Sequence, residues 1–528
     1  MKETEFKMPR LTIDGISVTV KEGTTILRAA VQAGIEIPSL CNLNGINAPV
    51  SCFICVVKVQ NVKNLVPSCA ALVREGMVVE TDTDEIRRYR KQALELLLSD
   101  HAGDCEAPCN RICPCNLDIP GITRFINTGL INDAIIAMRQ NLPLSGTLGC
   151  ICPAPCEKGC RKKKVDESVH IKTLHRLLST FDSTRNKPWK PSIPAKLHKK
   201  MGIIGAGPAG LSVAYFLACY GYKCSIYDDH EIPGGMIEYS ISQSAFDHSI
   251  LNSEISTIIN MGVKFFLNTS VGKDISFNTF LNKFDVIIIC TGNNGQSQLK
   301  DLTSYKDNFK INIDLKTGLT NHSNIFACGG IVHPGQIAAH SIGHARKTAE
   351  FVHQYLLTGN NKTKITPKFD SHLGKLFEGE LEEFKKIVEL NKKHNINPQT
   401  EPVREILSIS QSCLNCDCID KNICSLRHYS GIFDVKQFKY RTSHRKRLTR
   451  NFYKNGLVHE SGKCILCGRC VNITENSGLK YGVYFHGRGF PVCIKTPFSK
   501  PLDKALGDLQ DRCIEACPTG ALSKYNIK

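Results

Sequence analysis

Alternation of hydrophobic and polar positions divides the chain into segments of different character. Near the N-terminus, residues 11–20 (LTIDGISVTV) and 52–59 (CFICVVKV) form short β-type runs between turns, which predicts strands. Residues 86–185 change to helical periodicity, as in the segment 85–100 (EIRRYRKQALELLLSD). A proline- and lysine-rich stretch at 186–200 then predicts a linker to a further domain.

Beyond this linker, residues 201–221 (MGIIGAGPAGLSVAYFLACYG) read as an apolar strand, a glycine loop and a helix, which predicts the start of a βαβ unit. A helix near 344–356 closes this domain, and a charged helix at 381–394 leads to a cysteine-rich C-terminal region. No run of 18 apolar residues is present, and the N-terminus lacks the apolar core of a secretory signal. We therefore expect a cytoplasmic protein without a membrane span.

Composition adds one strong signal, the 26 cysteines among 528 residues. In a long chain without a secretory signal, clustered cysteines point to metal binding rather than disulfides. The formal charge of +18 omits the negative charge of ligating thiolates, so the metal-loaded protein is less basic than this count. No nucleic-acid recognition motif accompanies the basic charge, so we expect no nucleic-acid partner.

The first cysteine group predicts a [2Fe–2S] cluster. Cys41, Cys52, Cys55 and Cys69 are spaced C-x10-C-x2-C-x13-C, so that one loop supplies three thiolates and a later strand the fourth. Structural zinc or buried free thiols are the alternative. The preceding residues 23–41 resemble the ferredoxin-like N-terminal domain of the complex I large iron–sulfur subunit and of iron-only hydrogenases.

The segment from Asp104 to Arg176 resembles the N-terminal domain of the glutamate synthase small subunit and of dihydropyrimidine dehydrogenase. The resemblance rests on APC at 107–109, CPCNLDIP at 113–120, CPAPCEKGC at 152–160 and VHIKTLH at 169–175. It implies two [4Fe–4S] clusters with interleaved ligands. The implied thiolates are Cys113, Cys152 and Cys156 for one cluster, and Cys105, Cys109 and Cys160 for the other.

Each of these two clusters lacks a fourth cysteine in the family's pattern. His101 begins an H-x3-C motif that resembles a histidine-ligated cluster of complex I, which favours it over Cys115 as the ligand that joins Cys105. For the other cluster, His175 stands where the family has Gln or Glu. An imidazole there could bind iron and raise the reduction potential. The alternative for His175 is a histidine without a ligand role.

The glycine loop predicts a dinucleotide site, because it follows a strand, opens a helix and precedes an acidic residue after about 20 positions. Asp228 is the expected ribose contact, ahead of Asp229. The segments 232–236 (IPGGM), 287–292 (IIICTG) and 324–330 (NIFACGG) resemble the FAD half of the glutamate synthase family, which implies FAD rather than NAD. The expected cofactor-binding residues are Gly205, Gly207, Pro208, Ala209, Gly210, Asp228, Gly234, Gly235, Met236, Thr291, Gly292 and Gly329.

Two departures from that family change the expected function. About 30 residues stand where the family inserts its NADPH-binding domain, and the chain has no second glycine fingerprint. The family's glycine–aspartate pair near the flavin reads Gly329-Gly330 here. We expect FAD to be retained, the alternative being a relic scaffold, and we expect no nicotinamide site of the chain's own.

The C-terminal region carries two further cysteine groups. Cys464, Cys467 and Cys470 form C-x2-C-x2-C, and with Cys517 of the CPTGAL segment they predict one ferredoxin-type [4Fe–4S] cluster. The region resembles the ferredoxin-like segment of the complex I large iron–sulfur subunit. A second group of four cysteines could bind either a [4Fe–4S] cluster or zinc. Two cysteines separated by one residue are awkward ligands for one cubane, so Cys418 is the least secure ligand of this group. Its members are Cys413, Cys416, Cys418 and Cys424.

The predicted fold is multidomain, with α+β and α/β parts. The expected segments are a [2Fe–2S] ferredoxin-like β-grasp domain (8–85), a helical domain with two [4Fe–4S] clusters (86–190), a Rossmann-like FAD domain without an NADPH insertion (198–360), a helical linker (361–404) and a C-terminal ferredoxin-like [4Fe–4S] domain (405–528).

The predicted function is electron transfer within a larger redox enzyme, through FAD, one [2Fe–2S] cluster and three to four [4Fe–4S] clusters, with zinc as the alternative at one of these sites. The expected partners in a hetero-oligomer are an NADH-oxidising flavoprotein, a hydrogenase- or formate dehydrogenase-type catalytic subunit, or ferredoxin. No acid–base residue is expected to be catalytic. The alternatives are a stand-alone FAD-dependent NAD(P)H or small-substrate oxidoreductase, an electron-bifurcating flavin subunit, or a structural protein that keeps its clusters as scaffolding.

Overall fold

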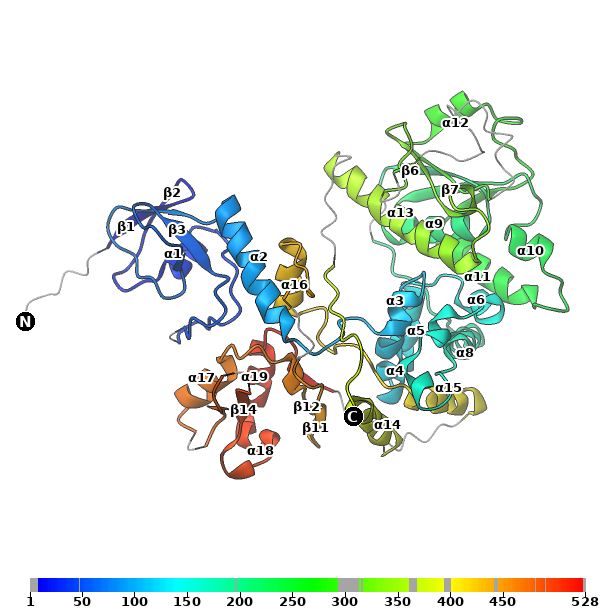
Figure 1. The fold of residues 1–528 in the computed structure, drawn as a ribbon. Coiled ribbons are helices and arrows are strands. Elements are labelled where there is room, and N and C mark those ends of the chain that lie inside the picture. The colour runs from blue at the N-terminus through cyan, green and yellow to red at the C-terminus, as the bar shows by residue number, and fades with distance from the viewer. Residues whose placement is uncertain are drawn as a thin grey trace, which may run out of the picture. The chain divides into compact units, whose positions relative to one another are not determined.

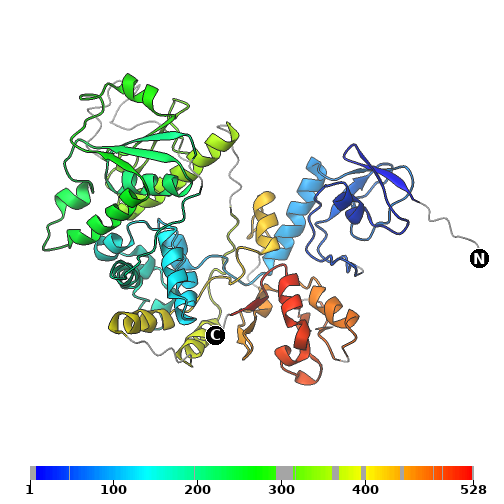
Figure 2. The same ribbon diagram turned by 180° about the vertical axis from the view of Figure 1, so that it is seen from behind.

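The protein forms two compact units, each assembled from separate stretches of the chain. The computed structural model (Figures 1 and 2) describes residues 8–46, 48–194, 197–292, 313–314, 317–359, 368–393, 400–440, 445–479, 481–489 and 491–525. The first unit comprises residues 1–106, 365–387 and 416–528, and the second comprises 107–364 and 388–415. The N-terminal and C-terminal cysteine groups thus belong to one unit.

The first unit begins with a five-stranded mixed sheet in the order β2-β1-β5-β3-β4, the arrangement of a β-grasp fold. β1 pairs antiparallel with β2 and parallel with β5, and α1 packs its apolar residues into the core of this sheet. The element bounds are β1 Arg10–Ile13, β2 Ile16–Thr19, α1 Ile26–Gln32, β3 Val56–Val59, β4 Val66–Pro67 and β5 Met77–Glu80.

A long helix, α2 (Asp84–Ser99), leaves this sheet, as the helical periodicity predicts; Thr83 caps its first turn by accepting from the Ile86 N–H. α16 (Ser425–Ile432) lies alongside α2 in both views (Figures 1 and 2). The C-terminal part is built around a small antiparallel sheet, β11-β12-β15, and a hairpin, β13–β14. Its bounds are β11 Asn451–Phe452, β12 Leu457–His459, α17 Arg469–Asn476, β13 Tyr484–His486, β14 Cys493–Lys495, α18 Leu502–Leu506, α19 Gln510–Ala516 and β15 Leu522–Lys524.

The second unit starts with a group of short helices, in which α6 packs against α8 and α4 against α5. Prolines occupy the first turn of α3, α4 and α7, where a missing N–H has no cost. α15 (Glu401–Gln411) joins this group by packing on α4 and α8. The other bounds are α3 Pro108–Ile112, α4 Ile119–Asn127, α5 Ile131–Arg139, α6 Ser145–Ile151, α7 Pro155–Lys158 and α8 Ile171–Ser183.

A parallel five-stranded sheet, ordered β10-β9-β6-β7-β8, completes the second unit and has the topology expected of a Rossmann-like domain. α9 and the 21-residue α13 pack together on it (Figure 1). The bounds are β6 Lys200–Ile204, α9 Pro208–Cys219, β7 Lys223–Tyr227, α10 Met236–Ser240, α11 His248–Asn260, β8 Lys264–Phe266, α12 Phe277–Lys283, β9 Val286–Ile289, β10 Ile325–Ala327 and α13 Ala338–Thr358. The segment of about 30 residues that the sequence comparison places where the family inserts its NADPH-binding domain lies largely outside the described residues.

The remaining helix, α14 (Glu380–Lys393), has three acidic residues in its first turn. Their negative charges interact favourably with the positive end of the helix dipole and so stabilise the helix. It covers the charged stretch for which the sequence predicts a helix. Within the part of the chain that the structure describes, no helix is long and apolar enough to cross a lipid bilayer.

Candidate metal centres and dinucleotide site

The first cysteine group gathers in the loop between α1 and β3 and at the end of β4. All four thiols are buried, and Cys41 hydrogen-bonds Cys52 and Cys69 while Cys55 hydrogen-bonds Cys69. The bond to Cys52 holds the pKa of Cys41 far below its ordinary value, and the same contact raises the pKa of Cys52. Four thiols that share their protons at such close range form a donor set ready to ionise onto a metal centre.

Backbone conformation shapes this loop. Val50 and Phe53 have φ of 53° and 54°, a left-handed conformation that non-glycine residues rarely adopt. The Ser68 hydroxyl and backbone N–H both donate to the Cys55 carbonyl, at 2.7 and 3.1 Å. These bonds fix the end of β4 against the loop and so position Cys69 beside the other three thiols.

A cavity in the second unit joins the residues implied for the first [4Fe–4S] cluster. Cys113, Cys152 and Cys156 line it together with His175, and its remaining walls are mostly apolar. Cys113 ends α3, Cys152 ends α6, Cys156 lies in α7 and His175 lies in α8. Three thiols and one imidazole from four short helices thus face one enclosed space.

The His175 ring is buried and held in one orientation. Its Nδ1 lies 3.1 Å from the carbonyl oxygen of Ser145, and burial lowers the pKa of the ring to about 4. The ring is therefore neutral at pH 7, with the Nδ1 proton donated to that carbonyl and Nε2 left with a lone pair. This is the arrangement in which histidine binds a metal.

Cys115 lines the same cavity but has a different partner. Its thiol donates to the Ala339 carbonyl at 3.2 Å, and its hydrogen bond to Cys113 lowers the pKa of that thiol to about 6. Ala339 belongs to the first turn of α13, and a Cβ at Gly343 on the same helix would lie only 2.1 Å from the Pro114 carbonyl oxygen. The cluster loop therefore rests directly on a helix of the Rossmann-like domain.

A second cavity, in the first unit, joins the C-terminal cysteines. Cys464, Cys467, Cys470 and Cys517 line it, as does Cys513, which the sequence pattern leaves without a role. Burial raises the pKa of Cys467 to about 12, so this thiol stays protonated until a metal binds it. Cys467 also shares a hydrophobic core cluster with Cys41 and Cys52 of the first cysteine group.

The glycine loop connects β6 to α9 within the second unit. Gly205 has φ of 105°, and a Cβ at Gly210 would lie 1.8 Å from the Gly205 carbonyl oxygen, so both positions require glycine. A Cβ at Gly207 would meet nothing closer than 3.9 Å, which leaves its backbone open to a ligand. The first turn of α9, with Pro208 and Ala209 at its start, points its N–H groups toward this opening.

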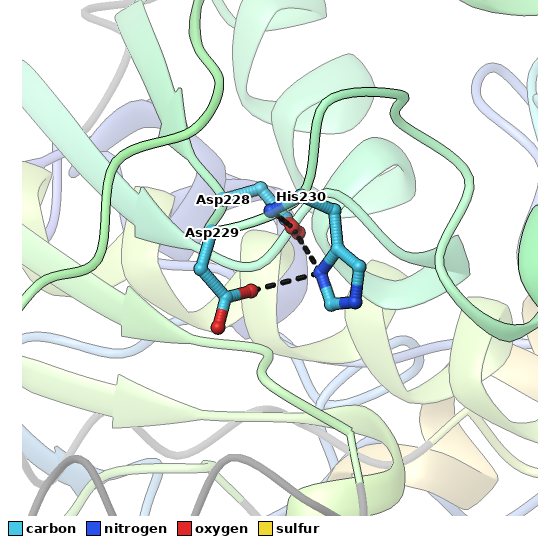
Figure 3. A group of neighbouring side chains, drawn as sticks. All are labelled: Asp228, Asp229 and His230. Atoms are coloured by element: carbon cyan, nitrogen blue, oxygen red, sulfur yellow. Dashed lines mark hydrogen bonds and ion pairs between the residues drawn. The ribbon is translucent and has the colours of Figure 1, made fainter.

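Asp228 lies directly after β7 and holds two partners. Its Oδ2 accepts from the Ala206 N–H at 2.5 Å, and its Oδ1 accepts from the backbone and ring of His230, each at 2.9 Å (Figure 3). Asp229 also contacts the His230 ring, at 2.8 Å. Partial burial lowers the pKa of His230, but the two carboxylates outweigh this effect, so that the pKa is raised. The sequence pattern finds Asp228 but gives no signal for His230.

Other predicted dinucleotide contacts lie around the same loop. Gly234 donates its N–H to the Ala206 carbonyl at 2.9 Å, and a Cβ at Gly235 would come within 2.8 Å of the Gly207 Cα. Met236 begins α10 and is exposed. Thr291, beside Gly292, has a buried hydroxyl for which the described part of the chain offers no hydrogen-bond partner. A buried hydroxyl that lacks a partner beside an open backbone loop fits a bound polar cofactor.

Gly329 has φ of 82°, and a Cβ there would lie 2.5 Å from that of Ala209. Its N–H donates to His344 Nδ1 on α13 at 3.3 Å. Glycine is therefore required at position 329, where the resembling family has the glycine of its glycine–aspartate pair. The turn at Gly329 packs against α9 through Ala209.

The remaining predicted ligands separate between the two units. Cys109 lies in α3 and Cys160 follows α7, and these two helices pack together where Gly159 lies against Ile112. Cys413 follows α15 in the second unit, whereas Cys416 belongs to the first. Cys105 lies in the first unit, where the backbone N–H of Cys418 donates to its carbonyl at 3.3 Å. His101, in the same unit, is buried, and burial followed by the charge of Lys463 lowers its pKa to about 3.

Three family models match the chain and confirm the [2Fe–2S], helical [4Fe–4S] and Rossmann-like domains that the motifs predict. Residues 7–84 match the 2Fe-2S iron-sulfur cluster binding domain, residues 82–187 match dihydropyrimidine dehydrogenase domain II with its 4Fe-4S cluster, and residues 203–258 match an NAD(P)-binding Rossmann-like domain. The chain therefore combines a [2Fe–2S] domain, a helical [4Fe–4S] domain and a dinucleotide-binding domain, the domain set of iron–sulfur oxidoreductases.

The similarity to curated relatives covers only part of this chain. The NADPH-Fe(3+) oxidoreductase subunit beta of Geobacter sulfurreducens is 40% identical over 190 residues, 35% of this chain and 28% of that protein. The NADP(+)-dependent formate dehydrogenase subunit beta of Moorella thermoacetica is 36% identical over 214 residues, 37% of this chain and 30% of that protein. The glutamate synthase [NADPH] small chain of Bacillus subtilis is 31% identical over 189 residues, 35% of this chain and 38% of that protein. The match thus spans less than two fifths of each relative.

Proposed function

We propose that the chain is an electron-transfer subunit of a larger oxidoreductase, in which FAD and iron–sulfur clusters relay electrons between an NADH-oxidising flavin partner and a terminal redox enzyme of hydrogenase or formate dehydrogenase type. The observation that carries this proposal is the cavity lined by Cys113, Cys152, Cys156 and His175, whose wall includes Ala339 of α13. A cluster in that cavity would lie against the same helix that packs on α9 of the dinucleotide domain.

The dinucleotide site supports FAD through its own residues. The open backbone at Gly207 and the first turn of α9 would receive the pyrophosphate. Asp228 keeps lone pairs free on both carboxylate oxygens and would accept from a ribose hydroxyl. The unpartnered Thr291 hydroxyl is a further contact. When bound, FAD would supply a group that exchanges one or two electrons, which suits one-electron clusters as its neighbours.

The cysteine groups support the proposed clusters. Cys41, Cys52, Cys55 and Cys69 would hold the [2Fe–2S] cluster, and Cys464, Cys467, Cys470 and Cys517 one [4Fe–4S] cluster. The shared hydrophobic core of Cys41, Cys52 and Cys467 would bring these two clusters close together through apolar packing. In the second unit, Cys113, Cys152, Cys156 and His175 would hold the cluster next to the dinucleotide domain.

A hetero-oligomer is supported by the relatives, two of which are by name beta subunits of an NADPH-Fe(3+) oxidoreductase and an NADP(+)-dependent formate dehydrogenase. The sequence of this chain contains one glycine fingerprint, so its electrons would enter or leave through a partner rather than through a nicotinamide site of its own.

The test is an anaerobic assay of the cofactor-loaded chain with and without the polypeptides that co-purify with it. Alone, the chain should reduce an artificial dye with NADH or NADPH at no more than background rate, although dithionite reduces its clusters. Addition of the co-purifying flavoprotein should restore NADH-driven dye reduction. Brisk NAD(P)H turnover by the chain alone would refute the subunit role and favour a stand-alone oxidoreductase.

A further inference from the structure

Three cysteines that are far apart in the sequence meet in the first unit. Cys105 follows α2, whereas Cys418 and Cys424 lie more than 300 positions later, just before α16. The backbone N–H of Cys418 donates to the Cys105 carbonyl at 3.3 Å, which joins the two segments directly. The Cys105 sulfur accepts from the backbone N–H of Ser371 at 3.3 Å. Cys105 and Cys418 are both buried.

Cys424 completes the group of thiols. Its sulfur accepts from the Arg427 N–H at 3.4 Å and donates to the Pro518 carbonyl at 3.5 Å. Burial, followed by the charges of Cys418 and Cys105, raises the pKa of Cys424 to about 12, so the three thiols lie within electrostatic range of one another. N–H groups that donate to sulfur are a regular feature of iron–sulfur sites, where they stabilise thiolate charge.

His101 is joined to this group of thiols through Lys463, whose charge acts on both His101 and Cys418. His101 is 8% exposed, and its buried Nδ1 has no hydrogen-bond partner among the residues that the structure describes. A Cβ at Gly103 would lie 3.3 Å from His101 Nε2 and 2.9 Å from Cε of Lys463, so both side chains close over Gly103. The buried Lys463 ammonium pairs with Glu460 and lies within electrostatic range of Cys418 as well. A buried imidazole nitrogen without a partner is costly unless something binds it.

We propose that Cys105, Cys418, Cys424 and His101 hold a [4Fe–4S] cluster of the first unit, formed by ligands from both ends of the chain. In this assignment Cys105 does not share a cluster with Cys109 and Cys160, although the family pattern places the three together. Two of the four cysteines between positions 413 and 424, Cys418 and Cys424, are ligands of the proposed cluster. Nothing in it depends on the identity of the partner enzyme.

We assign a cluster rather than a single zinc ion to these four ligands. Two thiolates on one zinc lie at most about 4.6 Å apart, twice the Zn–S bond length. In the part of the chain that the structure describes, only Asp228, Asp229 and His230 bring three such ligand atoms within 4.8 Å of one another. The atoms of a cubane's ligands stand farther apart, because each binds a different corner.

The position of this site gives it a role in electron transfer. Cys424 lies within electrostatic range of Cys517, a proposed ligand of the C-terminal cluster, and it packs on the hydrophobic core that contains Cys41, Cys52 and Cys467. The proposed cluster would therefore stand next to the other two metal centres of the first unit. The Lys463 ammonium would stabilise added electrons and so raise the potential of this cluster.

The ligand set is tested by anaerobic purification of the full chain with Cys105→Ser, Cys418→Ser or Cys109→Ser, followed by iron analysis and EPR after reduction. Cys105→Ser and Cys418→Ser should lose the same [4Fe–4S] signal and about four irons per chain, while Cys109→Ser keeps that signal. The [2Fe–2S] signal reports that the first unit is folded in each variant. Loss of one common signal in Cys105→Ser and Cys109→Ser, but not in Cys418→Ser, would overturn the proposal, as would loss of zinc alone in Cys418→Ser.

The histidine ligand is tested separately with His101→Cys, which keeps a ligand in place. This variant should retain the cluster and lower its reduction potential, because thiolate replaces imidazole. After ¹⁵N-histidine labelling, pulsed EPR at the field of this cluster's own signal should lose its nitrogen hyperfine coupling, whereas the coupling expected from His175 on the other cluster should stay. An unchanged potential with an unchanged nitrogen coupling would show that His101 is not a ligand. Loss of this signal in Cys416→Ser with no effect of His101→Cys would assign the fourth position to Cys416 instead.

Discussion

At the scale of single residues, histidines decide the proposed chemistry of two centres. His175 stands where the resembling family has Gln or Glu, and it lines the cavity of Cys113, Cys152 and Cys156. Because its Nδ1 lies against the Ser145 carbonyl, Nε2 is the nitrogen that would bind a cluster there. An imidazole ligand is neutral where a thiolate is negative, so it disfavours the oxidised cluster and raises the potential. His175 and His101 would each give this chain a cluster with a potential above that of an all-cysteine site.

For His175, we predict that His175→Ala loses one [4Fe–4S] cluster, about four irons per chain, and that His175→Cys keeps the cluster at a lower potential. EPR-monitored redox titration measures both effects. His170→Ala is the matched control, because the His170 side chain is 58% exposed just before the same helix, and it should change neither iron content nor potential. Full iron content and an unaltered potential in His175→Ala would contradict the ligand role.

At the same scale, Asp228 shows how one side chain serves two purposes. It holds the glycine loop through the Ala206 N–H and at the same time pairs with His230. Motif spacing identifies such an acid, because the strand and helix that frame it are local. The partner His230 depends on the path of the chain after β7, for which spacing carries no information.

At the scale of elements, the short helix α6 connects the cluster cavity to the dinucleotide domain. Its first residue, Ser145, supplies the carbonyl that orients His175, and Cys152 follows its last turn. Glu254 of α11, only 3% exposed, accepts from the Gly146 N–H at 2.7 Å and from the Thr147 N–H and hydroxyl at 3.1 and 2.7 Å. Arg139 balances its charge at 3.3 Å.

We predict that Glu254→Ala lowers the stability of this part of the chain by about 3–5 kcal/mol, because it leaves Arg139 without one of its buried acidic partners and three donors of α6 without an acceptor. The measurement is the urea concentration at which the visible absorbance of the cluster disappears under anaerobic conditions. The control is Glu167→Ala, whose side chain is 81% exposed and which should leave that midpoint unchanged. An equal midpoint for wild type and Glu254→Ala would refute this structural role.

At the scale of the whole molecule, the elements follow from local sequence patterns, whereas the pairing of distant segments does not. The strand, glycine loop and helix of 201–221 appear as β6, the loop and α9, and the periodicity of 85–100 appears as α2. Their signals lie within one stretch of 15 to 20 residues. The [2Fe–2S] group is also local, since all four cysteines fall within 41–69.

Sequence patterns do not assign a cysteine to its cluster when its neighbours in space come from distant parts of the chain. The Cys418 N–H donates a hydrogen bond to the Cys105 carbonyl, and the Cys115 thiol donates one to the Ala339 carbonyl. Each of these hydrogen bonds joins residues more than 200 positions apart in the sequence. Family resemblance covers residues 82–187 and thus assigns Cys105 only to partners within that segment. The C-terminal segment that returns to it lies outside the resemblance.

The proposed function requires that one chain carries electrons between a flavin and its clusters. The direct measurement is a light flash given anaerobically to the FAD-loaded chain with EDTA as the sacrificial electron donor, followed by rapid freezing and EPR at increasing times. We expect flavin absorbance to recover while reduced [4Fe–4S] and [2Fe–2S] signals grow in the same samples, at a rate independent of protein concentration. A flavin that stays reduced beside clusters that stay oxidised, although dithionite reduces those clusters, would contradict it.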